Sequence, residues 1–141
     1  MSKKKYGIIE HTADIGISVT SSGLKGLFRD AAIAMFDIIA HKKAGAAIAE
    51  KQTLGIKLFS DDIDELFINW LNELLSLSAT RGLIFEKLKI IRLTENEIEA
   101  QAYGSGSEAF RLKKEIKAAT YHGLRIKKKG NRFYAEVIFD I

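Results

Sequence analysis

The chain has 141 residues, of which 47% are hydrophobic and 28% are charged, and it contains no cysteine. These values fit one folded domain spanning residues 1–141, and they exclude a disordered chain, a disulfide scaffold, a thiolate zinc site and a cysteine nucleophile. The formal net charge of +4 favours anionic partners without selecting a function.

The N-terminal segment does not resemble a signal peptide, because Glu10, His11 and Asp14 interrupt any apolar run after the basic first residues. The longest apolar stretch elsewhere, residues 31–40, contains Asp37 and is far shorter than the roughly 20 residues that cross a bilayer. We therefore expect a cytoplasmic protein whose partners include neither a membrane nor DNA.

Two amphipathic helices are predicted. The first has an apolar stripe at helical spacing, formed by Leu24, Leu27, Phe28, Ala31, Met35 and Ile38. Ser22 is its expected N-cap. The second has a wider apolar face, formed by Ile63, Leu66, Phe67, Trp70, Leu71, Leu74 and Leu75. Acidic residues crowd its start, where Ser60 or Asp61 is the expected cap, and Gly82 is expected to end it.

Short segments rich in β-branched residues predict strands at residues 16–20, 52–59, 83–93, 97–103, 120–127 and 133–141. The last segment alternates most regularly and should turn its odd-numbered residues, Phe133 to Ile141, toward the core. Gly130 and Asn131 tolerate the positive φ of a tight turn, so a C-terminal hairpin is expected. The fold class is α+β with mainly antiparallel sheets, and residues 104–107 (GSGS) are expected to form a flexible loop.

Residues 11–16 (HTADIG) place His11 and Asp14 three positions apart, just before a predicted strand. A structural explanation is available, because Thr12 and Asp14 are suited to turn hydrogen bonds and Gly16 relieves backbone crowding. A functional explanation requires a second carboxylate.

The C-terminus supplies that carboxylate, because Asp140 precedes Ile141 and its free terminal carboxylate. If the first and last strands are neighbours, Asp14 and these two groups converge into an oxygen-rich site suited to Ca²⁺ or Mg²⁺ rather than zinc. The alternative is that the terminal residues lie in water, as chain ends usually do. Against this, Ile141 continues the inward-facing set of the final strand.

Residues 115–122 are a second candidate region, in which Lys117 and His122 are suited to contact phosphate or a partner's acids. An exposed strand edge explains the same pattern. A basic patch in this half of the chain comprises Lys113, Lys114, Lys127, Lys128, Lys129 and Arg132. It favours RNA contact, although a solvated hairpin tip explains residues 127–129 equally well.

The common catalytic motifs are absent, including the Gly-x-Ser-x-Gly elbow, the P-loop and the His-Glu-x-x-His helix. The pairs His11 with Asp14, or Asp14 with Asp140, are compatible with metal-assisted hydrolysis. No nucleophile or substrate pocket can be assigned to such a reaction, so we expect the protein not to be an enzyme.

Four strings carry a resemblance to a known family: residues 11–16 (HTADIG), 69–75 (NWLNELL), 115–122 (EIKAATYH) and 137–141 (VIFDI). Their order and spacing, with the chain ending directly after Asp-Ile, resemble archease over essentially the whole length. The resemblance implies a compact, β-sandwich-like α+β domain. It also implies a bound divalent cation, Ca²⁺ above all, whose ligands correspond to Asp14, Asp140 and Ile141.

The function implied by the resemblance is that of an accessory protein to the GTP-dependent tRNA-splicing RNA ligase. Such a protein promotes guanylylation of the ligase's active-site histidine and multiple turnover, and in some members it broadens the nucleotide triphosphate accepted. RNA contact would then be indirect. The residues expected to contact the partner are His11, Glu115, Lys117, Thr120 and His122.

Two other functions remain open from the sequence. One is an RNA-binding or chaperone-like module that uses the basic C-terminal hairpin, and a salt-dependent affinity for bare RNA would favour it. The other is a metal-dependent hydrolase, which turnover of a phosphoester by the protein alone, abolished by Asp14→Ala, would support.

Overall fold

The computed structural model describes residues 6–10, 14–44, 50–120 and 125–141. The helices are α1 (Leu24–Ile39) and α2 (Ile63–Arg81). The strands are β1 (Tyr6–Glu10), β2 (Asp14–Ser21), β3 (Ala40–Lys42), β4 (Lys51–Phe59), β5 (Leu83–Leu93), β6 (Glu97–Gly106), β7 (Phe110–Leu112), β8 (Ala118–Thr120), β9 (Lys127–Lys129) and β10 (Arg132–Asp140). A short 3₁₀ turn, Ser107–Ala109, joins β6 to β7.

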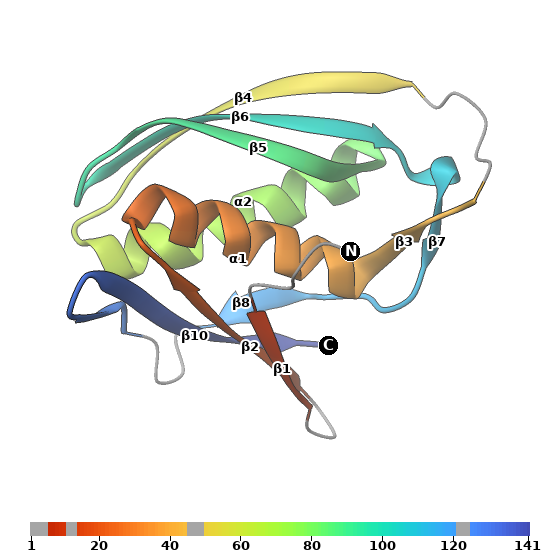
Figure 1. Cartoon of the computed structure of the whole chain (residues 1–141). Coiled ribbons are helices and arrows are strands. Elements are labelled where there is room, and N and C mark those ends of the chain that lie inside the picture. Colours follow the sequence, from red (N-terminus) through yellow and green to blue (C-terminus); the bar gives the residue numbers. More distant parts are fainter. Residues whose placement is uncertain (1–5, 11–13, 45–49, 121–124) are drawn as a thin grey trace.

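The two helices lie between two antiparallel sheets (Figure 1). One sheet has the order β1-β2-β10-β8, with β9 also paired to β10, and the other has the order β4-β6-β5. A small β3-β7 pair lies at one end. Helix α1 packs on β5 and β2, and α2 packs on β8, β5 and β4. The predicted α+β class with antiparallel sheets and two helices is confirmed.

The core forms where the apolar stripes of the helices meet. Phe28 of α1 and Phe67 of α2 pack edge to face with ring centroids 4.8 Å apart. Trp70 is completely buried, and its indole Nε1–H donates to the carbonyl oxygen of Phe28 at 3.0 Å. The helical spacing read from the sequence therefore identified the buried faces correctly.

The helix starts differ from the prediction. Helix α1 has Gly23 at its N-cap without a side-chain hydrogen bond, so the assignment of Ser22 was wrong. Helix α2 is capped by Asp62 rather than by Ser60 or Asp61, because the Asp62 carboxylate accepts from the backbone N–H of Glu65 at 2.8 Å. Its C-cap is Gly82 in the left-handed conformation (φ 64°), as predicted.

Replacing Asp62 with alanine is expected to lower the free energy of unfolding by about 1 kcal/mol, because one N–H group in the first turn of α2 loses its acceptor. Asp61→Ala removes the same charge one residue earlier without removing the cap, so it is the matched control. Urea denaturation followed by circular dichroism measures both. Equal losses in the two variants would contradict the assignment of the cap.

The prediction of a flexible loop at residues 104–107 was wrong. Strand β6 continues to Gly106, and its last three residues, 104–106, are buried. A Cβ on Gly104 would lie 3.0 Å from the Phe85 ring. The Ser105 hydroxyl also hydrogen-bonds the carboxylate of Glu86 on β5. These small residues therefore serve close packing between strands.

The C-terminal hairpin is confirmed, with Gly130 at φ 59° in the turn between β9 and β10. The single strand predicted at residues 120–127 was wrong: Thr120 ends β8, Lys127 begins β9 and residues 125–126 belong to no strand, while residues 121–124 lie outside the described part of the chain. The strands β1, β3 and β7 were not predicted. No helix within the described residues is long and apolar enough to cross a membrane.

Candidate metal-binding site

The first candidate site lies where β2 begins and β10 ends. These strands are antiparallel neighbours, and Asp14 and Asp140 are direct register partners. Such partners place their side chains on one face, with Cβ atoms about 4.5–5.5 Å apart. Their neighbours Ile15 and Phe139 are buried on the opposite face, so both carboxylates belong to the outer face of the sheet. The strand adjacency on which the sequence hypothesis depended is therefore present.

The end of the sheet that holds Asp14 and Asp140 is called the carboxylate corner below. One atom of Asp14 favours a bound ligand at this corner. Its Oδ1 is buried and has no hydrogen-bond partner within the described residues. A buried carboxylate oxygen without a partner is costly, and such atoms usually pair with a donor or an ion. Asp140 is exposed and directly opposite, so its negative charge adds repulsion rather than compensation. A cation between the two carboxylates would relieve both costs.

The chain terminus is anchored at the same corner. Ile141 is half-buried and packs against the core, as expected from its position in the inward-facing set of β10. This packing holds Ile141 beside Asp140 instead of letting the end of β10 fray.

All the donors available at this corner are oxygens, which suit a hard cation such as Ca²⁺. Among the described residues, no three His, Cys, Asp or Glu side chains come together as a metal cluster. A cation bound here would therefore need the terminal carboxylate of Ile141 as well as the side chains of Asp14 and Asp140. With that third group, the residues present fit a divalent ion.

Of the five residues predicted to contact the partner protein, the structure describes Glu115, Lys117 and Thr120, and each has a different environment. Lys117 is exposed beside the corner, and its backbone N–H donates to the carbonyl oxygen of Asp140 at 2.8 Å. The Thr120 hydroxyl donates to the carbonyl oxygen of Ile138 at 3.1 Å, which gives it a role within the sheet. Glu115 is exposed and lines a pocket. His11 and His122 lie outside the described residues.

Asn72 is a positioning residue that the sequence analysis did not identify. Its side-chain Nδ2 donates to the carbonyl oxygen of Ala119 at 3.0 Å, and its Oδ1 accepts from the Ala119 N–H at 2.8 Å. Because Ala119 lies in β8, this double contact ties α2 to the strand that follows Lys117. The sequence signal was its place beside the apolar face of α2, within the string 69–75 that carries the family resemblance.

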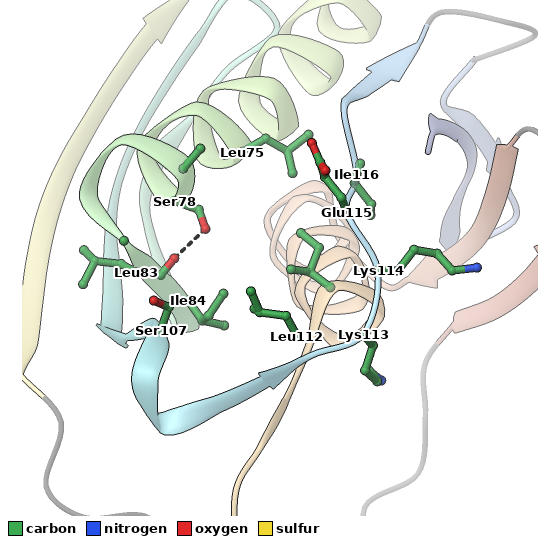
Figure 2. Close-up of a pocket in the computed structure, with 13 residues that line it drawn as sticks. Leu75, Ser78, Leu83, Ile84, Ser107, Leu112, Lys113, Lys114, Glu115 and Ile116 are labelled. Carbon is green, nitrogen blue, oxygen red and sulfur yellow. Dashed lines mark hydrogen bonds between the residues drawn. The ribbon is translucent and has the colours of Figure 1, made fainter.

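The pocket beside Glu115 has a volume of about 540 Å³ and is lined mainly by apolar side chains from α2, β5 and residues 112–116. Figure 2 shows Leu75, Ile84 and Leu112 around it, with the ammonium groups of Lys113 and Lys114 directed away. Its lining therefore offers apolar contact rather than convergent catalytic groups.

The basic hairpin is the remaining candidate, and its three β9 lysines are exposed. Lys128 Nζ lies 5.5 Å from the ring centroid of Phe133, and Lys129 Nζ lies 5.7 Å from that of Tyr134. The hairpin thus presents positive charge at the end of the sheet remote from Asp14 and Asp140. Any activity of the carboxylate corner is spatially separate from it.

Comparison with known families identifies a match to the Archease protein family (MTH1598/TM1083) over residues 6–141. The archease of Methanosarcina acetivorans is 36% identical, with 98% of this chain and 97% of that protein covered. The archease of Pyrococcus abyssi is 34% identical, with 98% of this chain and 99% of that protein covered.

Two solved structures share the fold. The solution structure of Methanobacterium thermoautotrophicum protein 1598 superposes with a TM-score of 0.72 at 26% identity and covers 99% of this chain and 100% of that chain. The crystal structure of a Thermotoga maritima archease, described as a possible chaperone, superposes with a TM-score of 0.62 at 21% identity and covers 94% of each chain.

Proposed function

Because the chain belongs to the archease family, we propose that it is an accessory protein of the GTP-dependent tRNA-splicing RNA ligase. In this role it promotes guanylylation of the ligase and multiple turnover, and it is not itself the catalyst. The observation that supports this proposal best is the facing pair Asp14 and Asp140, with a buried, unpartnered oxygen on Asp14. A carboxylate pair on the surface is suited to act on a partner's site.

In this proposal Asp14, Asp140 and the terminal carboxylate of Ile141 would hold a divalent ion, Ca²⁺. When bound, the ion supplies positive charge that offsets the carboxylates and can attract a phosphate oxygen. The protein's own contribution is positional: the β2-β10 register holds Asp14 opposite Asp140, and core packing of Ile141 holds the terminus beside them.

Lys117 extends this corner with a positive charge of its own. Its backbone is fixed by the hydrogen bond to Asp140, while its side chain is exposed and able to reach a phosphate or an acidic residue of the ligase. The corner therefore combines anionic ligands for a cation with a cationic side chain for a nucleotide.

The description of the Thermotoga relative as a possible chaperone agrees with a protein that acts on another protein. Chaperone-like action and ligase activation differ in what the partner gains. A chaperone raises the fraction of folded ligase, whereas an activator raises the guanylylation rate of ligase that is already folded.

The test is guanylylation of the cognate ligase with GTP and divalent metal, in the presence and absence of this protein, under single-turnover and multiple-turnover conditions. Acceleration of both, with ligase whose folded fraction is the same in each sample, is the expected result. No acceleration under either condition would contradict the proposal. Repeating the assay with ATP tests whether nucleotide acceptance is broadened.

The alternative function is direct RNA binding by the basic hairpin. The observation in its favour is the exposed run Lys127–Lys129 with neighbouring aromatic rings. If this function were correct, replacing these lysines would weaken binding to bare RNA and Asp14→Ala would not.

A further inference from the structure

The β4-β6-β5 sheet has one face against the helices and one face that no element of the described chain covers (Figure 1). Alternate residues of β6 divide between these faces, with Ile98, Ala100 and Ala102 buried and the residues between them half-exposed. The uncovered face, called the outer sheet face below, carries Lys57, Phe59, Lys87, Lys89, Arg92 and Tyr103.

The outer sheet face is basic. Its cationic side chains are Lys51, Lys57, Lys87, Lys89 and Arg92, and the carboxylates among them are Glu86, Glu97 and Glu99, which leaves a net charge of +2. Arg92 Nε lies 3.5 Å from a Glu97 oxygen. The lysines at positions 57, 87 and 89 are exposed, and none forms an ion pair with another described residue. Lys87 and Lys89 are therefore available to anionic groups, whereas Lys57 lies directly opposite Glu99 of β6.

One aromatic ring lies beside Lys57 and another beside Lys87. Phe59 is 66% exposed, and Lys57 Nζ lies 5.8 Å from the centroid of its ring. Lys87 Nζ lies 5.3 Å from the ring centroid of Tyr103, whose hydroxyl donates to Gln101. Each ring thus has an ammonium group within reach, a combination suited to stacking a base and pairing its phosphate.

The middle of the face is flat rather than crowded. A Cβ built on Gly55 of β4 meets no atom within 4 Å, although Gly55 is paired directly with Gln101. Lys87 and Lys89 lie on the far side of β6, two residues apart on the same face of β5. Such spacing separates their Cα atoms by about 6.6 Å, so neighbouring phosphates can be contacted along the strand.

We propose that the outer sheet face binds single-stranded RNA, with bases on Phe59 and Tyr103 and phosphates on Lys57, Lys87 and Lys89. Single strands fit because their unstacked bases can lie on exposed rings, whereas bases in a duplex cannot. The choice of RNA over DNA rests on the proposed function, since the ligase joins RNA ends. Binding here is direct, and it is separate from both the basic hairpin and the carboxylate corner.

The test is fluorescence anisotropy of a labelled, mixed-sequence single-stranded RNA with this protein alone, at several salt concentrations. The K87Q/K89Q pair should weaken binding and reduce the slope of log affinity against log salt by about 1.4, since each lost contact contributes about 0.7. Phe59→Ala should weaken binding about 5- to 150-fold through lost stacking. An unlabelled DNA of the same sequence serves as competitor.

Matched controls separate this face from the others. The K127Q/K128Q pair removes the same charge from the hairpin, and Leu112→Ala truncates a side chain of a residue that is 64% exposed elsewhere. Both should bind RNA like the native protein. The proposal would be overturned if the two lysine-pair variants lost RNA affinity equally, or if only the hairpin pair lost it. It would also be overturned if the native protein showed no RNA binding near physiological salt. Displacement by DNA as easily as by RNA would overturn the choice of RNA.

The guanylylation assay tests the proposed function separately from RNA binding, because the guanylylation step includes no RNA. The K87Q/K89Q variant is expected to stimulate it as the native protein does. If the native protein binds RNA on this face and fails to stimulate the ligase, the proposed function fails alone. If stimulation is normal and RNA is not bound, the outer sheet face fails alone.

Discussion

Replacing Asp14 with asparagine is expected to reduce Ca²⁺ affinity by on the order of 100-fold or more, because the site loses one of its anionic ligands. Isothermal titration calorimetry measures this directly. In the native protein, Ca²⁺ at 100 times its Kd should raise the free energy of unfolding by about 2.7 kcal/mol. The variant should show no such gain, and its stimulation of ligase guanylylation should be lost.

The same variant should behave differently when the metal is removed with a chelator. Asp14 and Asp140 face each other directly, and Asp14 Oδ1 is buried without a described partner. Removing one of two like charges relieves repulsion, so the metal-free variant is expected to be at least as stable as the metal-free native protein. A clear loss of metal-free stability would indicate that Asp14 has a structural donor instead.

Glu136→Gln is the matched control for Asp14→Asn. Glu136 is exposed on the outer face of the same sheet and hydrogen-bonds the hydroxyl of Tyr134, remote from the terminus. The control should bind Ca²⁺ and stimulate the ligase normally. Unchanged Ca²⁺ affinity in Asp14→Asn would contradict the metal site. Lost affinity with full stimulation would show that the metal is structural.

Replacing Trp70 with alanine is expected to lower the free energy of unfolding by about 4 kcal/mol, the largest effect on stability that we predict. The indole is completely buried at the contact between the two helices. Truncation of such a side chain creates a cavity in a core that packs both sheets. Because the stability of a domain is about 5–15 kcal/mol, we expect a measurable fraction of the variant to be unfolded at 37 °C.

Urea denaturation followed by far-ultraviolet circular dichroism measures this effect, since the chain's single tryptophan is then absent. Trp70→Phe retains most of the apolar contact and loses the hydrogen bond to Phe28, so a smaller loss of about 1–2 kcal/mol is expected. Ile91→Ala, at a residue that is 43% exposed, should change stability by less than either. A Trp70→Ala variant as stable as Ile91→Ala would contradict the assigned core.

The sequence predicted the elements whose signal is local and repeated. Both helices and the long strands β5 and β10 have many residues at a regular period, so single exceptions do not obscure them. Gly82 was equally recognisable, because a positive φ at the end of a helix favours glycine. Strands of three residues, such as β3 and β7, have too few residues to show a period and were missed.

The errors occurred where a neighbouring strand decides the structure. Gly104 and Gly106 have the composition of a flexible loop, yet Gly104 is paired on both sides within the sheet and Gly106 is paired with Leu83 of β5. Glycine is needed there because Phe85 occupies the space that a Cβ on Gly104 would take. Local propensity contains no information about that ring.

The sequence by itself determined the class of fold, the buried helix faces and the supply of carboxylates at Asp14, Asp140 and the terminus, because each follows from residue type and local spacing. Only the tertiary structure decided that Asp14 lies directly opposite Asp140, that Glu115 lines an apolar pocket, and that lysines of β4 and β5 share an uncovered face. The physical reason is that strand pairing between distant segments is selected by burial of the whole core, which no short stretch of sequence specifies.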